Sequence, residues 1–139
     1  MITREIGRYI SDNVEKLTWE GEDNNIFVDH IPHLPDKCIG IFSTGGLNGQ
    51  MWQQDYRNPT MQIIARGNES PEWSYEVSVE IYQLLHGRSS FDLTAENSEK
   101  IYQVVSIMGL QSEPVGLGMD SSNRHKHSLN YQLEFKEVG

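Results

Sequence analysis

The chain has 139 residues, a single cysteine and a formal net charge of −9, from 20 acidic and 11 basic side chains. This length fits one domain, residues 1–139, whose core needs no disulfide. The charge argues against a surface built to hold nucleic acid, which requires clustered Lys and Arg. No stretch is apolar for long enough to span a membrane or to form a signal peptide.

A first helix is predicted over residues 4–17, because apolar side chains recur there at helical spacing, with Thr3 as its N-cap. Residues 26–28 predict a short strand. The two prolines within residues 30–35 remove backbone donors and predict a loop.

Residues 38–42 predict a buried strand. We expect Cys38 to be a small buried hydrophobe and not a catalytic thiol, because no activating arrangement surrounds it. The glycine-rich residues 43–50 predict a mobile loop that lacks the Gly-Lys-Ser/Thr ending of a phosphate-binding loop. Residues 59–66 predict the next strand.

Two readings fit the segment that follows the glycine-rich loop. Met51, Trp52 and Tyr56 behind a glycine hinge are the side chains that a partner-binding loop carries. The alternative is a loop tip that folds back onto its own core, which is the more favoured reading for Trp52.

A second helix is predicted over residues 71–86, with Ser70 as its N-cap and Gly87 as its stop. The apolar arc expected to cover the sheet consists of Trp73, Val77, Ile81, Leu84 and Leu85. A second stripe consists of Tyr75, Val79, Tyr82 and His86. A surface helix needs one apolar arc, so the second stripe predicts either burial within the chain or contact with another subunit, for which Tyr is suited.

The last part of the chain is rich in strand signals. Residues 91–94 predict an edge strand, residues 101–110 a strand with Gly109 as a candidate bulge, and residues 127–136 a final strand of strict apolar and polar alternation. A long connection through residues 114–124 joins the last two strands as a hairpin. The expected fold is α+β, a two-layer sandwich of a mostly antiparallel sheet with two helices packed on one face.

Five histidines raise the question of a metal site. His30 and His33 have H-x-x-H spacing, and His125 and His127 have H-x-H spacing, which places two ligands on one strand face. Neither pair carries an H-E-x-x-H signature. A small metal-dependent enzyme using His125 and His127 is therefore the weaker alternative, and we predict no metal, no cofactor and no catalysis.

Three stretches, by their order and spacing, resemble the tail terminator family of long-tailed bacteriophages, also described as minor capsid proteins. The first is residues 59–67, a strand that ends in Arg, and the second is residues 75–87 of the helix. The third combines Pro114-x-x-Leu-Gly-x-Asp120 with Arg124 and the strand residues 129–133.

The resemblance implies structural work. Such proteins form a ring, typically a hexamer, on the head-proximal end of the tail tube, where they stop tube growth and join the tail to the head. The implied partners are copies of the chain itself, the tail tube protein and the head connector or stopper protein, with DNA only passing through the ring. The implied location is the head–tail junction of the virion, after synthesis in the host cytoplasm. A head–tail connector subunit of the same machine is the alternative.

Asp120 suits a turn, through side-chain bonds to nearby backbone, and we expect Asp120 and Arg124 to fix the long connection or to touch a neighbouring subunit. The residues predicted to form subunit or partner contacts are Met51, Trp52, Tyr56, Tyr75, Val79, Tyr82, Asp120 and Arg124.

Overall fold

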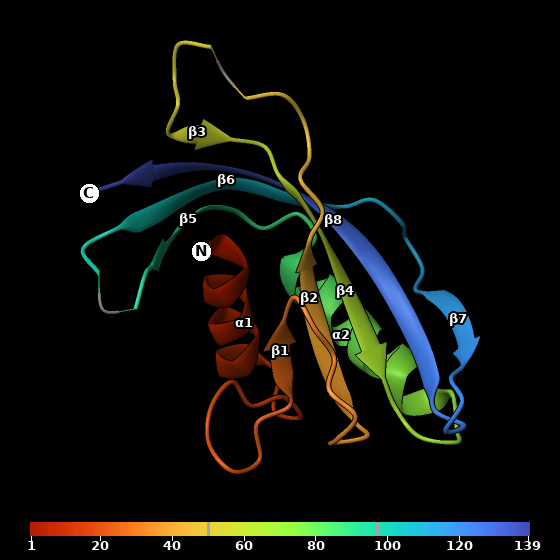
Figure 1. The fold of residues 1–139 in the computed structure, drawn as a ribbon. Coiled ribbons are helices and arrows are strands. Elements are labelled where there is room, and N and C mark those ends of the chain that lie inside the picture. The colour runs from red at the N-terminus through yellow and green to blue at the C-terminus, as the bar shows by residue number, and fades with distance from the viewer. Residues whose placement is uncertain (50, 97) are drawn as a thin grey trace.

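The computed structural model describes residues 1–49, 51–96 and 98–139. Its helices are α1 (Ile2–Asn13) and α2 (Glu72–Leu85). Its strands are β1 (Ile26–Val28), β2 (Cys38–Ser43), β3 (Tyr56–Arg57), β4 (Thr60–Arg66), β5 (Ser89–Thr94), β6 (Ile101–Gly109), β7 (Val115–Met119) and β8 (His125–Val138). Figure 1 shows one curled sheet with both helices on its inner side, which confirms the predicted α+β class.

The strand order is β1-β2-β4-β8-β6-β5, and all described pairings are antiparallel except that of β1 with β2. β5 lies at the edge, as predicted. The 14-residue β8 organises the sheet, because it pairs with β4, β6, β3 and β7. On one side β4 and then β3 follow it, and on the other side β7 and then β6.

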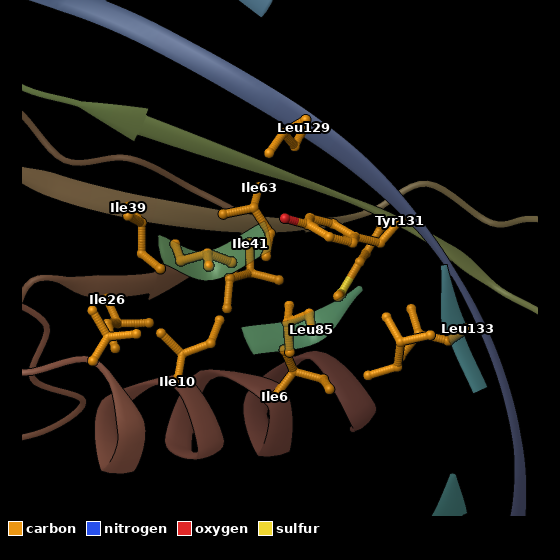
Figure 2. Packing of buried hydrophobic residues seen from close by; sticks show 14 of the residues in the cluster. Ile6, Ile10, Ile26, Ile39, Ile41, Ile63, Leu85, Leu129, Tyr131 and Leu133 are labelled. Carbon is orange, nitrogen blue, oxygen red and sulfur yellow. The ribbon is translucent and has the colours of Figure 1, made fainter. Parts of the chain in front are cut away.

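The core lies between the sheet and the helices. The alternation predicted for the last strand is confirmed, because Leu129, Tyr131, Leu133 and Phe135 are all buried. Figure 2 shows how the two layers meet: Ile6 and Ile10 of α1 point toward the inner side chains of the strands, and Leu85 of α2 lies among them. Packing of this apolar surface is the main source of stability in a fold of this size.

The first helix is shorter and earlier than predicted. α1 ends at Asn13, and Val14 has an extended backbone, with φ of −119° and ψ of 110°. Val14 and Leu17 are nevertheless buried. The apolar spacing in the sequence therefore marked buried positions, and these continue beyond the end of the helix. The prediction of Thr3 as N-cap was wrong, because Thr3 lies inside the first turn and is buried. Neither described helix is long and apolar enough to cross a membrane.

The second helix matches its prediction closely. The prediction of Ser70 as N-cap was wrong by one residue, because Pro71 occupies that position, although the Ser70 hydroxyl accepts a hydrogen bond from the Glu72 backbone N–H at 3.3 Å. Gly87 has φ of +79°, which suits its role as the stop. The buried residues of α2 are Ser74, Val77, Ser78, Ile81 and Leu85. The buried face of α2 therefore differs from the predicted one: it includes Ser74 and Ser78, whereas Trp73 and Leu84 are only partly buried.

The hairpin of the last two strands is confirmed, but its connection differs from the prediction. Part of the connection forms β7, which pairs with the start of β8. Between β6 and β7 a side chain replaces the backbone as the hydrogen-bond partner of β8: the Gln111 Oε1 accepts the Asn130 backbone N–H at 2.8 Å. The bulge lies between Val104 and Ser106 and not at Gly109. A Cβ on Gly109 would lie 2.6 Å from the Tyr82 ring, so this glycine lets α2 approach β6.

The segment from β2 to β4 follows most of its prediction. Cys38 is fully buried, and burial raises the pKa of its thiol, as expected for an inert side chain. The predicted glycine-rich loop begins one residue late, since Ser43 still belongs to β2, and its last residue, Gln50, lies outside the described residues. The two-residue strand β3 was not predicted.

Candidate functional site

The most exposed aromatic side chain belongs to the connection between β2 and β3. We call residues 44–49 and 51–55 the Trp52 loop. Trp52 is 89% exposed and Met51 82% exposed, so Trp52 does not fold back onto the core, contrary to the favoured reading. The base of the loop is fixed by hydrogen bonds from Leu47 N–H to the Asn58 carbonyl, 3.1 Å, and between the Thr44 and Thr60 hydroxyls, 2.6 Å.

Tyr56 belongs to the base of this loop and not to its tip. It pairs with Lys136 in the β3–β8 ladder, and its hydroxyl donates to the Glu134 carboxylate. The adjacent Arg57 binds Glu137 at 2.6 Å. Tyr56 is therefore half-buried and holds the Trp52 loop to the sheet, while Met51 and Trp52 are presented to solvent.

The second stripe of α2 divides into an exposed and a covered part. Tyr75 stays 38% exposed, and its hydroxyl donates to Glu113 at 2.9 Å. That hydrogen bond, together with the negative charge of Glu113, raises the pKa of the Tyr75 phenol. The Tyr75 ring meets His127 edge-on, with 5.8 Å between ring centroids.

Tyr82 and Val79 are half-buried. The Tyr82 ring stacks on His86 with 4.7 Å between centroids and 8° between planes, and it packs against the core. The His86 Nδ1 accepts the Gly109 backbone N–H at 2.9 Å. Burial within the chain thus accounts for Tyr82, whereas Tyr75 remains a surface side chain.

Asp120 and Arg124 hold the turn between β7 and β8. The Asp120 Oδ1 accepts the backbone N–H of Ser122 at 2.9 Å and of Arg124 at 3.0 Å, and its Oδ2 accepts Arg124 Nε at 2.9 Å. Desolvation raises the pKa of the Asp120 carboxyl, but these donors and the guanidinium charge outweigh it, so the pKa lies below its usual value.

Arg124 is only 8% exposed and reaches across to the loop before β2. Its Nη1 donates to the His33 carbonyl and lies 3.2 Å from the Asp36 carboxylate. Arg66 binds the same loop, through the carbonyls of Pro35 at 2.7 Å, Asp36 at 3.1 Å and His33 at 3.2 Å. The expectation that Asp120 and Arg124 fix the connection is therefore met by intrachain contacts, and the structural role of Arg66 was missed.

The predicted contact residues do not gather in one place. The Trp52 loop is anchored where β3 meets Lys136 and Phe135, near the end of β8. Tyr75 meets His127 near the start of β8, and Asp120 and Arg124 lie in the turn between β7 and β8. The structure therefore has two separate candidate surfaces, one at each end of β8.

His30, His86 and His127 make internal side-chain contacts. The His127 Nδ1 lies 2.7 Å from the Ser74 hydroxyl, and His30 Nδ1 lies 3.0 Å from the Val28 carbonyl. Burial, and secondarily the neighbouring His125, lowers the pKa of His127. The Ser74 side chain is fully buried, so this Ser–His pair offers substrate no accessible nucleophile. Within residues 1–49, 51–96 and 98–139, no group of three His, Cys, Asp or Glu side chains is arranged to hold a metal.

Sequence reasoning missed one further surface feature. We define the apolar strip as four residues of β6, β7 and the segment after β6, each between 45% and 50% exposed: Met108 50%, Leu110 46%, Val115 45% and Leu117 48%. Its signal was present as apolar residues at period two in Val115-Gly-Leu117, but the glycines and Pro114 favoured a turn.

These observations define a small α+β protein whose prominent surface features are apolar and aromatic, as in proteins that assemble with others. The family model described as bacteriophage tail terminator protein matches residues 2–137, and the chain belongs to this family. It is thus a structural protein of the phage tail and a component of the virion, and the resemblance stated from the sequence is confirmed. A search of curated protein sequences gave no match.

Proposed function

We propose that this protein forms a ring, typically a hexamer, that caps the head-proximal end of the tail tube, stops tube growth and joins the tail to the head connector or stopper protein. The observation that carries the proposal is the match of the tail terminator family over residues 2–137. In this proposal the partners are copies of the chain, the tail tube protein and the connector, and the site of action is the head–tail junction.

The surface features support a role in assembly. A loop that exposes Met51 and Trp52 offers the flat, apolar anchors that dominate contact energies between proteins. Tyr75 adds a surface aromatic side chain with a polar end at the opposite end of β8. We further propose that the protein works without catalysis, as a cap whose action is binding alone.

The net charge of −9 suits a ring through which DNA passes. Among the described residues, ion pairs with carboxylates engage the basic side chains of Arg8, Lys16, Arg57, Lys100 and Arg124. Arg66 is buried against carbonyl groups. An acidic wall repels a phosphate backbone, so DNA slides past it without adhering.

The test combines the protein with polymerising tail tube protein. Mass photometry at rising concentration is expected to show a discrete ring species, and negative-stain electron microscopy to show tubes capped at one end that no longer lengthen. Tubes that grow equally long with and without the protein, together with strict monomers at every concentration, would contradict the proposal. Caps at tube ends that still permit growth would point to a connector subunit.

A further inference from the structure

The Trp52 loop and the apolar strip lie at diagonally opposite corners of β8. The loop is anchored by β3, which pairs with Phe135 and Lys136, whereas β7 pairs with residues 125–128. Phe135 and Ser128 are seven positions apart, about 23 Å along the strand. Because β3 and β7 also lie on opposite sides of β8 (Figure 1), the base of the loop and the β7 part of the strip are separated both along β8 and across it.

The apolar strip lies on the outer face of the sheet, away from the helices. Met108 stands opposite Gln132 and Val115 opposite Ser128, and residues paired directly across an antiparallel ladder share a face. Gln132 and Ser128 alternate along β8 with the core residues Leu129, Tyr131 and Leu133, which places them on the other face, although Ser128 is itself only 3% exposed. Leu110 follows Met108 two positions further along, and its backbone N–H donates to the Asn130 carbonyl, which extends the strip past the end of β6. Leu117 lies at the register shift between Gly116 and Gly118 of β7 and is 48% exposed.

Unpaired opposite charges accompany the two surfaces. Asp55 is exposed at the base of the Trp52 loop, and Lys126 lies beside β7, on the same face as Ser128. In the part of the chain that the structure describes, neither side chain forms an ion pair. A contact between loop and strip would therefore bring an acidic border of one surface to a basic border of the other.

We propose that the Trp52 loop of one copy of this chain docks on the apolar strip of the next copy, head to tail. The inference rests on the proposed ring, which it deepens by naming the two contact surfaces. A contact between two different surfaces of one chain is heterologous, and it generates a closed ring when the rotation between copies closes. A two-fold dimer in which each loop docks on the other copy's strip would also satisfy both surfaces, so a ring is distinguished from that dimer by the number of copies in the assembled species.

The size of the loop predicts weak association in dilute solution. A tryptophan side chain buries about 150–250 Å², whereas a stable interface buries about 800 Å² on each partner. Trp52 and Met51 thus supply the anchor of the contact and not its whole area. Ring formation is then expected only at high protein concentration or on the tube end, where several copies are held together.

The test uses three single variants of the full chain. Trp52→Ala removes the anchor, Leu117→Glu places a charge in the strip, and Leu34→Ala truncates an exposed leucine that belongs to neither surface. All three positions are exposed, so near-ultraviolet circular dichroism and thermal unfolding are expected to show native folds. Mass photometry then measures the concentration at which half of the protein is in rings.

The first two variants are expected to raise that concentration at least tenfold, and Leu34→Ala to leave it unchanged. A mixture of Trp52→Ala with Leu117→Glu retains one intact loop and one intact strip, and it is expected to form hetero-dimers but no rings. The charge variants Asp55→Lys and Lys126→Glu are each expected to weaken ring formation, and the double variant to restore it at least in part.

Each contrary result has a distinct meaning. Rings of the wild-type protein that persist unchanged in Trp52→Ala and Leu117→Glu would overturn the loop-to-strip contact and leave the proposed function standing. Normal rings of Trp52→Ala that fail to cap tubes would also overturn it, and would assign the loop to the tube protein. A wild-type protein that forms no rings and caps no tubes would overturn the proposed function and this contact together.

Discussion

Arg66 and Arg124 donate hydrogen bonds to the same carbonyl oxygen, that of His33. The two arginines come from β4 and from the turn before β8, and both are buried. Each also binds the Asp36 region, Arg66 through the Asp36 carbonyl and Arg124 through its carboxylate. The proline-containing loop that precedes β2 is thus fixed by β4, which pairs with β2, and by the turn before β8, which pairs with β4.

Arg124→Ala is expected to lower the free energy of unfolding by about 2–4 kcal/mol, because a hydrogen bond to a charged group contributes about 1.5–3 kcal/mol and the variant loses the bonds to Asp120 and to the His33 carbonyl. Urea denaturation measures the change. The exposed Lys37→Ala is the control and is expected to lie within about 0.5 kcal/mol of wild type. An Arg124 variant as stable as the control would show that the contacts to His33 and Asp120 contribute nothing.

Tyr131→Phe is expected to stabilise the protein by up to about 1 kcal/mol. The Tyr131 hydroxyl is fully buried and has no hydrogen-bond partner among the described residues, which costs desolvation energy. Burial also raises the pKa of this phenol. The control is Tyr56→Phe, which loses a hydrogen bond to Glu134 and is expected to destabilise by about 1 kcal/mol. Thermal and urea unfolding of the two variants show whether each one gains or loses stability. A loss of stability in Tyr131→Phe would contradict the expectation that its unpaired hydroxyl is destabilising.

His127 is expected to make stability depend on pH. Its folded-state pKa is lowered from 6.5 by burial and by His125, so the unfolded chain takes up the proton first and stability falls as pH drops below about 6.5. Above that pH both states hold a neutral ring and the effect vanishes. Unfolding measured from pH 7.5 to 5 is expected to show a smaller decline in His127→Gln than in wild type. Equal slopes would exclude His127 as the source.

Gly45 and Gly46 are adjacent glycines that differ in their surroundings. Both have positive φ, +89° and +106°, so alanine costs about 1–2 kcal/mol of backbone strain at either position. A Cβ on Gly45 meets open space, whereas one on Gly46 would lie 2.6 Å from the Pro59 Cα. Gly46→Ala is therefore expected to be clearly the more destabilising in urea unfolding, and to displace the base of the Trp52 loop. Equal losses in the two variants would argue against that close approach.

The α2 tyrosines are expected to separate folding from assembly. Leu85→Ala truncates a fully buried side chain and should cost about 2–5 kcal/mol. Tyr82→Ala is expected to cost part of that amount, because the ring packs on the core and on His86. Tyr75→Ala should cost less than about 1 kcal/mol while still weakening ring formation. If Tyr75→Ala were as unstable as Leu85→Ala, the Tyr75 side chain would have to be part of the core.

The sequence allowed the last strand and the second helix to be predicted because each pairs one buried face with one exposed face. Leu129 to Phe135 alternate strictly, and Ser70, Pro71 and Gly87 mark the helix ends. β7 could not be predicted in this way. Its glycines favour a turn locally, and it becomes a strand only because β8 extends far enough to pair with it.

The candidate surfaces show the same limit. The composition of residues 51–56 indicated a contact loop, but only the structure shows that Tyr56 is tied to Glu134 while Trp52 remains free of the core. The covering of Tyr82 depends on Gly109, which comes from a strand far along the chain. Contacts between distant segments of this kind leave no periodic trace in the amino-acid order.

β8 follows in the chain all four strands with which it pairs. During synthesis on the ribosome, the edges of β4 and β6 that pair with β8 therefore remain unpaired until residues 125–138 have emerged. The Trp52 loop and the strip receive their anchoring through β8 in the same final step. We therefore expect chains that end before β8 to lack ordered forms of the two surfaces proposed for the ring contact, and so not to enter rings.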